Sequence, residues 1–170
     1  LAKWWKLSYG RPKLSEAVAS IPRYLACSRV TKRPIFFFVD SAIKPGDAMQ
    51  IFALADDYSF GILQSDVHWQ WFIAKCGKLT ERPRYNGDSV FHTFPWPQAP
   101  TAAMVTAIAN AGKAVRTLRA EAAEKQGIGL RALYRTLDLP GKNPLREAHE
   151  VLNAAVMKAY GFAAKKPILQ

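Results

Sequence analysis

The hydrophobic pattern of the chain changes near Pro100, and this change limits the folds that the chain can adopt. Before Pro100, short apolar runs rich in β-branched and aromatic residues alternate with turn residues, which is typical of strands. After Pro100, apolar residues recur in steps of three and four, which is the spacing of one face of an α-helix. We therefore predict an α+β protein, with a β-rich domain over 1–97 and a helical C-terminal segment over 98–170.

Five segments of the first part have the length and composition of strands. They are 21–30, 35–40, 50–56, 60–64 and 89–94. Two helices are expected beside them: a short one over 14–20, and a longer one that Ser65-Asp66 caps and Gly77 ends. The segment after Arg84 is expected to begin with a turn at Tyr85-Asn86-Gly87.

In "SVFHTF", residues 89–94, alternation predicts a half-buried strand, which the prolines of "FPWP" then end. Trp96 is expected to anchor the junction with the helical segment, and Tyr85 is also assigned a structural role. Thr101 should cap the first helix of that segment, which "KQGIG" ends. Further helices over 130–137 and 145–161 complete a predicted small antiparallel bundle.

The charge of the chain points to an anionic partner. Lys and Arg number 24 against 13 Asp and Glu, which gives a net charge of +11. Such a balance favours nucleic acid before other polyanions. No apolar run approaches the roughly 20 residues that a membrane span needs, so no membrane partner is expected. The chain opens "LAKWWK", without methionine or a signal-peptide pattern, and we expect a fragment of something longer.

Metal and catalytic sites are not predicted. Cys27 and Cys76 lack CxxC spacing, and His68, His92 and His149 stand singly, so no zinc site is expected. The two cysteines suggest core thiols in a reducing, cytoplasmic setting, and His149 is interpreted as a packing residue. There is no glycine-rich phosphate loop, nucleophile elbow or carboxylate pair, and "KNPL" lacks the second proline and aromatic residue of an NPPY-type motif.

Basic residues gather where loops are expected, above all in "KCGKLTERPRYNG". Arg82 and Arg84 would point to the same side of an extended segment. Each could then offer a bidentate fork to a guanine edge or a phosphate. The alternative is a solvated polar loop in which Glu81 pairs with a neighbouring arginine. Tryptophans that could stack on bases are more often core residues at their spacing: Trp4, Trp5, Trp69 and Trp71.

Four stretches follow one another along the chain: "RPKLSEAVASIPRYLACSRV", "FGILQSDVHWQWF", "ERPRYNGDSVFHTFPWP" and "LYRTLDLPGKNPLREAHEVLNAAVMKAYGF". Together they resemble the C-terminal part of the MmeI-like enzymes, which are single-chain restriction-modification proteins, and of their solitary DNA-methyltransferase relatives. The resemblance implies a target recognition domain followed by a helical segment. It also implies an upstream methyltransferase domain in the same polypeptide, which uses S-adenosylmethionine, and in many members a nuclease.

The resemblance also suggests which residues meet double-stranded DNA. Base-reading residues are expected just before the tyrosine of "Y…FPWP" and in an upstream loop. On this chain they are Thr80, Arg82, Arg84, Ser41 and Lys44. Phosphate contacts are assigned to basic residues of the loops, with Lys44 serving here too: Arg29, Lys32, Arg33 and Lys78. Glu81 falls out of step with the two arginines, which leaves the register of reading open.

These observations predict a sequence-specific DNA recognition module of an adenine methyltransferase, itself catalytically inert. Two other classes remain open at this point. The chain could be a protein-interaction module with an aromatic surface, or an RNA-binding domain in which Trp4, Trp5 or Trp69 stacks on bases.

Overall fold

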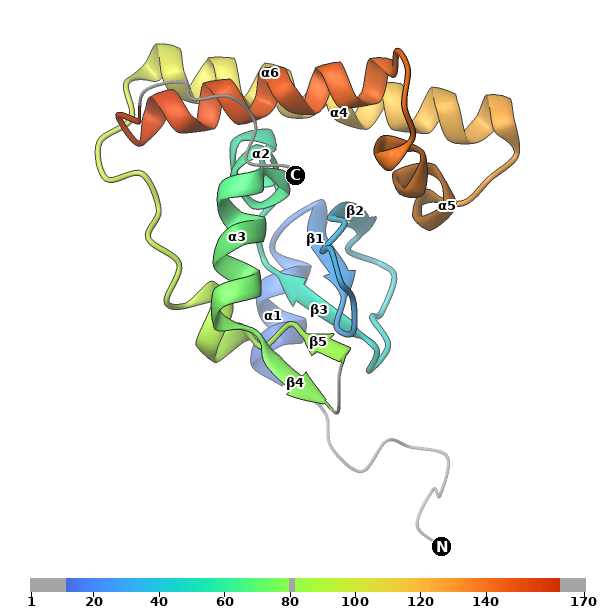
Figure 1. Cartoon of the computed structure of the whole chain (residues 1–170). Coiled ribbons are helices and arrows are strands. Elements are labelled where there is room, and N and C mark those ends of the chain that lie inside the picture. Colours follow the sequence, from blue (N-terminus) through green and yellow to red (C-terminus); the bar gives the residue numbers. More distant parts are fainter. Residues whose placement is uncertain (1–11, 80–81, 163–170) are drawn as a thin grey trace, which may run out of the picture.

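The structure, a computed structural model, describes residues 12–79 and 82–162. It is a mixed α+β fold, as predicted. Two long antiparallel helices lie side by side along one edge of the molecule. The sheet and the shorter helices lie on one side of this pair, below it in the view of Figure 1. No helix in these ranges is long and apolar enough to cross a membrane.

A three-stranded antiparallel sheet has the order β2-β1-β3, built from β1 (Arg23–Ser28), β2 (Phe37–Asp40) and β3 (Met49–Phe52). The central strand β1 is buried on both faces. Leu25 and Cys27 belong to an aromatic cluster on one face, while Tyr24 and Ala26 pack with helix α1 (Pro12–Ala19) on the other. This two-sided burial explains why β1 has an almost continuous apolar sequence.

Two of the predicted strands are not formed, and helical structure occupies all or part of each. The segment 60–64 lies in α2 (Asp57–Gln64), which Asp56 caps by accepting the Ser59 N–H at 2.7 Å. Every residue from Phe60 to Gln64 is buried. A helix buried on all sides has no polar face, so its short apolar run cannot be told from a buried strand by periodicity.

The second correction concerns residues 89–94. They begin inside a π-helical turn, η1 (Gly87–Phe91), whose N-cap is Asn86. Val90 and Phe94 are buried and His92 is exposed. Because Val90 and Phe94 are four residues apart, they fit one helical face as well as one strand face. The Val90 N–H donates to the Asn86 carbonyl and the His92 N–H to the Gly87 carbonyl, which is a helical pattern and excludes the strand.

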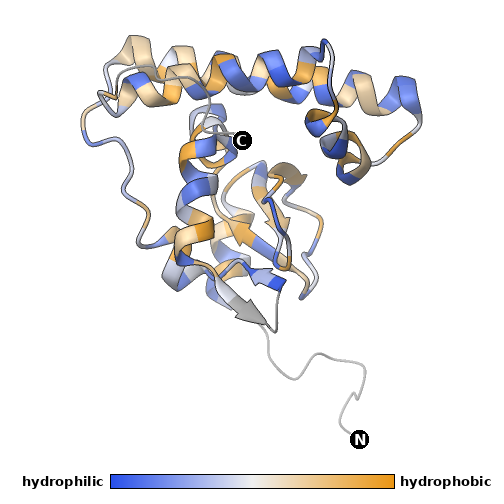
Figure 2. Ribbon diagram, in the orientation of Figure 1, coloured by the Kyte–Doolittle hydropathy of each residue, from blue (hydrophilic) through white to orange (hydrophobic). Residues whose placement is uncertain are grey.

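Helix α3 (Asp66–Lys75) follows α2 directly and is capped by Ser65, as expected. Helix α3 ends at Lys75, and Cys76 is its C-cap. Gly77 is the first residue of a two-stranded hairpin, formed by β4 (Gly77–Leu79) and β5 (Arg82–Arg84). Figure 2 shows β5 as a hydrophilic strand beside the more hydrophobic sheet.

The helical segment contains α4 (Ala102–Gln126), α5 (Leu130–Arg135) with the 3-10 turn η2 (Thr136–Asp138), and α6 (Pro144–Ala159). Thr101 caps α4, and Gly127 ends it with the left-handed φ of 61°. The expected helices are thus present, but α5 stands apart from the paired α4 and α6 (Figure 1).

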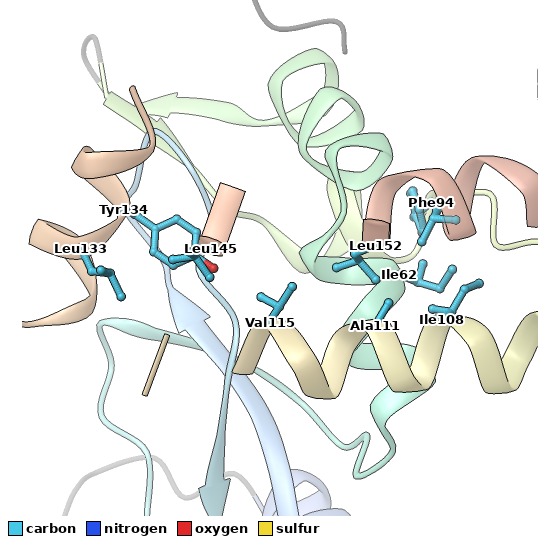
Figure 3. Packing of buried hydrophobic residues seen from close by; sticks show 10 residues of the cluster. Ile62, Phe94, Ile108, Ala111, Val115, Leu133, Tyr134, Leu145 and Leu152 are labelled. Atoms are coloured by element: carbon cyan, nitrogen blue, oxygen red, sulfur yellow. The ribbon is translucent and has the colours of Figure 1, made fainter. Parts of the chain in front are cut away.

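One hydrophobic cluster joins both parts of the chain. Ile62 of α2 packs with Ile108 and Val115 of α4 and Leu152 of α6 (Figure 3). The helices α2 and α4 approach closely at Gly61 and Gly112. A Cβ on Gly61, for example, would lie 2.7 Å from Ile108 Cγ2. The domain boundary at 97/98 stays a prediction, but α2 and the last helices share a core.

Candidate nucleic-acid interface

Strand β5 presents two arginines from a backbone that is held on both edges. It pairs with β4 on one side. On the other side the Thr31 N–H donates to the Pro83 carbonyl at 3.1 Å, and the Tyr85 N–H donates to the Arg29 carbonyl at 2.7 Å. Alternate residues of a strand share a face, so Arg82 and Arg84 project together. Both are exposed, and neither forms an ion pair with the residues that the structure describes.

The residue after this strand is a buried anchor. Tyr85 is 1% exposed, its ring stacks on Phe72 at 5.5 Å between centroids, and its hydroxyl lies 3.0 Å from His68 Nε2. Burial raises the pKa of Tyr85 and lowers the pKa of His68 to about 3, so both groups are neutral near pH 7. A rigid pair therefore fixes the end of the arginine strand.

A groove of about 940 Å³ separates β5 and the loop after β1 from helix α5. Apolar side chains form much of its lining, among them Val30, Ile35 and Met49. Its charged lining residues are five basic ones and one acidic one: Lys32, Arg33, Arg82, Arg131, Arg135 and Asp138. The groove is thus a positively charged channel with a partly apolar lining, the character expected of a surface that meets a polyanion.

Arg33 joins the walls of the groove. Its Nη2 lies 3.2 Å from Asp66 Oδ1 at the start of α3, and its guanidinium lies over the rings of Trp69 and Tyr134 at 4.5 and 5.7 Å. Asp66 also accepts a hydrogen bond from Asn153 of α6 at 2.6 Å. Burial raises the pKa of Asp66, against the opposing effects of Arg33 and Asn153. The Arg33 guanidinium therefore already has a carboxylate partner and two aromatic neighbours within the protein.

Helix α5 is docked by a second tyrosine. The hydroxyl of Tyr134 lies 3.0 Å from His149 Nε2 of α6, and both residues are buried. Beyond η2, Arg146 donates to the carbonyls of Leu137, Leu139 and Gly141. These contacts fix the C-terminal end of α5, and the chain that follows it, against the rest of the molecule.

Comparison with known proteins identifies the family. A sequence model described as "MmeI, target recognition domain" matches residues 9–98. The chain belongs to the MmeI target recognition domain family. This confirms the resemblance inferred from the sequence motifs.

Two relatives extend the MmeI match. DNA methyltransferase A of Bacillus subtilis (strain 168) is 35% identical over 106 residues, which cover 62% of this chain and 11% of the relative. The structure of the type IIL restriction-modification enzyme MmeI in complex with DNA superimposes with a TM-score of 0.75 at 29% identity. That match covers 85% of this chain and 19% of the MmeI chain, so the chain spans only a minor part of either relative.

Within this MmeI-type fold, the predicted base-reading residues do not all lie together. Arg82 and Arg84 share β5, whereas the Ser41 N–H bonds the Pro22 carbonyl at the start of β1. Arg84 bridges Val30 beyond the end of β1, and a strand rises about 3.3 Å per residue. The two sites are therefore separated by at least the length of the six-residue β1, about 17 Å from its first to its last Cα by that rise.

The remaining predicted DNA contacts differ in the exposure of their side chains and in whether an acidic side chain lies beside them. Lys44 and Lys32 are exposed. Arg29 is half-buried and lies 3.5 Å from Asp47 Oδ1. Lys78 lies in β4 opposite Pro83, but its side chain is outside the description, and Thr80 lies outside the described residues altogether.

The candidate stacking residues are engaged in packing. The Trp69 Nε1–H donates to the Lys32 carbonyl at 3.2 Å, and the Trp71 Nε1–H donates to the Val90 carbonyl at 3.0 Å. Trp96 is half-buried and packs against both large hydrophobic clusters. Trp4 and Trp5 lie outside the described residues.

Other expectations about chemistry concern cysteines and metals. Cys27 and Cys76 are both free thiols, with Cys27 buried and Cys76 partly exposed at the end of α3. Over residues 12–79 and 82–162, no group of His, Cys, Asp and Glu is placed to hold a metal ion.

The sequence reasoning missed the arginines of α5. Arg131 and Arg135 are four residues apart, so they share one side of the helix, and both are exposed and line the groove. The basic pair in "LRALYR" was the available signal. The leucines and the tyrosine of that segment already account for a helix, so the two arginines do not stand out in the sequence.

Proposed function

We propose that this chain is the module that reads the sequence of double-stranded DNA for an adenine-specific DNA methyltransferase. The observation that carries the proposal is β5, which displays Arg82 and Arg84 on one face and whose Arg82 lines a basic groove. Membership of the MmeI target recognition domain family supports it, and so does the DNA in the MmeI structure.

In this proposal Arg82 and Arg84 read bases in the major groove. An arginine fork that is bidentate to guanine discriminates by about 1–3 kcal/mol against a wrong base. Thr80, Ser41 and Lys44 are the other proposed base-reading residues. Ser41 and Lys44 would have to reach a different part of the site, because they lie away from β5. Of the four predicted phosphate contacts, Arg29, Lys32 and Lys78 are proposed here. Arg33 is left out because its guanidinium is paired with Asp66.

Methyl transfer itself is assigned to an upstream domain of the same polypeptide, with S-adenosylmethionine as the methyl donor. That domain would flip the target adenine out of the duplex, because a stacked base is inaccessible to chemistry. We place the enzyme in the cytoplasm of a prokaryote. The chain described here contributes recognition, and its own residues take no part in the chemical step.

The test determines which DNA sequence the parent enzyme methylates, in the wild type and in two variants. Arg82→Lys keeps the charge but removes the fork, so methylation should persist with relaxed preference at one base pair. Arg84→Lys should relax a different base pair. Lys125→Arg, on an exposed position at the end of α4, is the matched control. An unchanged recognition sequence in both β5 variants would refute base reading by this strand.

A further inference from the structure

Helix α5 supplies cations to the groove from the side opposite β5. Arg131 and Arg135 lie on one face of α5, and Lys32 and Arg82 line the same groove from the loop after β1 and from β5. All four are exposed, and none has an ion-pair partner among the residues that the structure describes. The fifth cation, Arg33, is paired with Asp66 and does not compete for the space.

This arrangement gathers positive charge around the groove with little acidic compensation. Like charges on facing walls repel, and Asp138 is the one acidic residue among the lining residues. The fold nevertheless holds helix α5, which forms one wall of the groove, in place. The Tyr134 hydroxyl lies 3.0 Å from His149 Nε2, and Arg33 lies over the Tyr134 ring. The cations of α5 are thus kept in place by contacts that do not neutralise them.

We propose that the groove seats a sugar-phosphate backbone of the DNA whose bases β5 reads, and that Arg131 and Arg135 bind its phosphates. The proposal rests on the proposed function and deepens it, because it makes the helical segment a second DNA-binding wall. Charge complementarity identifies the occupant: a duplex carries one negative charge per roughly 1.7 Å of its axis. The apolar lining around Val30, which is 42% exposed, suits the uncharged sugar faces between phosphates.

The consequence is a division of labour between the two walls. Phosphate contacts fix affinity and register without carrying sequence information, whereas base contacts carry the information. Loss of the α5 arginines should therefore weaken binding to every duplex equally. Loss of a β5 arginine should change which duplex is preferred.

The experiment measures the binding constant of the parent enzyme for duplex DNA at several salt concentrations, from roughly 50 to 200 mM. Each phosphate contact contributes about 0.9 to the magnitude of the slope of log K against log salt. The variant Arg131→Ala/Arg135→Ala removes two contacts, so the magnitude of its slope should be lower by about two. Its methylated sequence should stay the same. The control Lys125→Ala/Lys158→Ala removes the same charge from the same segment at exposed positions outside the groove lining, and should leave the slope unchanged.

A slope that does not change, or that changes equally in the control, would overturn the proposal. An unchanged slope combined with a less stable parent enzyme would mean that the groove holds an acidic segment of protein instead, and this also overturns it. The proposed function fails separately. If the slope falls as expected while the β5 lysine variants keep the wild-type recognition sequence, then DNA occupies the groove but β5 does not read it.

Discussion

Each half of the molecule contains a buried tyrosine whose hydroxyl lies 3.0 Å from a buried histidine, and the two pairs differ in their surroundings. The pair Tyr85–His68 lies among aromatic rings, including those of Phe36 and Phe72. The pair Tyr134–His149 lies beside two guanidinium groups, those of Arg33 and Arg119.

The difference follows from what each pair supports. Tyr85 fixes the end of β5 within a core that one aromatic cluster already defines, so apolar packing suffices. Tyr134 attaches a helix of six residues, too short to bury much apolar surface, at a junction of several elements. There Arg33 reaches from the sheet side, and Arg119, 5% exposed, reaches from α4. Packing places β5, the proposed base-reading strand, and polar contacts add to packing in placing helix α5.

The largest expected effect is the loss of the Tyr85 ring. Replacing a buried aromatic residue by alanine costs about 3–5 kcal/mol of folding free energy. Tyr85 contacts the rings of Phe36, Phe52, Phe72 and His68, so Tyr85→Ala should lie at the upper end of that range. Tyr134→Ala should cost less. Denaturant unfolding of the two variants measures the difference, and equal costs would contradict the contrast between the pairs.

Acid should destabilise both pairs, by about 2–3 kcal/mol in total between pH 7.5 and 5.5. Burial lowers the pKa of His68 and of His149 to about 3, below the unfolded value near 6.5. The unfolded chain therefore binds protons first. The stabilisation is complete above pH 6.5 and is lost as the pH falls from 6.5 toward 3.

The acid effect is checked by denaturant unfolding at several pH values. His149→Gln places an amide near the imidazole Nε2 and removes one titrating group. It should halve the change in unfolding free energy per pH unit, whatever its effect on the absolute stability. A slope equal to that of the wild type would mean that His149 titrates alike in the folded and unfolded chain.

The sequence predicted well wherever a local signal decides the structure. The caps at Ser65 and Thr101 and the glycine at 127 set helix ends through hydrogen bonds to near neighbours, and all three are where they were expected. It failed for 60–64 and 89–94, because burial on all sides and an i, i+4 pair are compatible with either kind of element. Those choices are made by tertiary contacts, such as Ile62 against Leu152.

The candidate site shows the same limit. The arginines of β5 could be found because their spacing in one extended segment is local. The opposite wall could not, since Arg131 reaches the groove only through the packing of α5 on residues far away in the chain. Arg33 was predicted as a phosphate contact, and nothing in its neighbourhood in the sequence signals Asp66, 33 residues later.

A smaller effect tests whether the two halves unfold together. Gly61→Ala would place a Cβ 2.7 Å from Ile108 Cγ2 and 3.0 Å from the Ile108 carbonyl, between α2 and α4. Overpacking of this kind costs about 1–3 kcal/mol, partly offset by the better helix propensity of alanine, so a net loss of about 1–2 kcal/mol is expected. Gly46→Ala, with no atom within 4 Å of the new Cβ, is the control.

Calorimetry decides how the loss at Gly61 is distributed. A single transition that moves to lower temperature as a whole is expected, because α2 shares one cluster with α4 and α6. Two separate transitions, only one of them shifted, would show that the halves fold as independent units.

The smallest expected effect concerns Arg33, which joins the two halves. Arg33→Lys keeps the charge and a contact with Asp66, but loses the planar group over Trp69 and should cost about 1 kcal/mol of stability. Because the guanidinium is engaged with Asp66, the salt dependence of DNA binding should not change, in contrast to Arg131 and Arg135. The measurement pairs thermal unfolding with binding at several salt concentrations. A fall in the salt slope as large as that of a lost phosphate contact would assign Arg33 to the DNA after all, and would leave Tyr134–His149 as the principal contact that holds α5 in place.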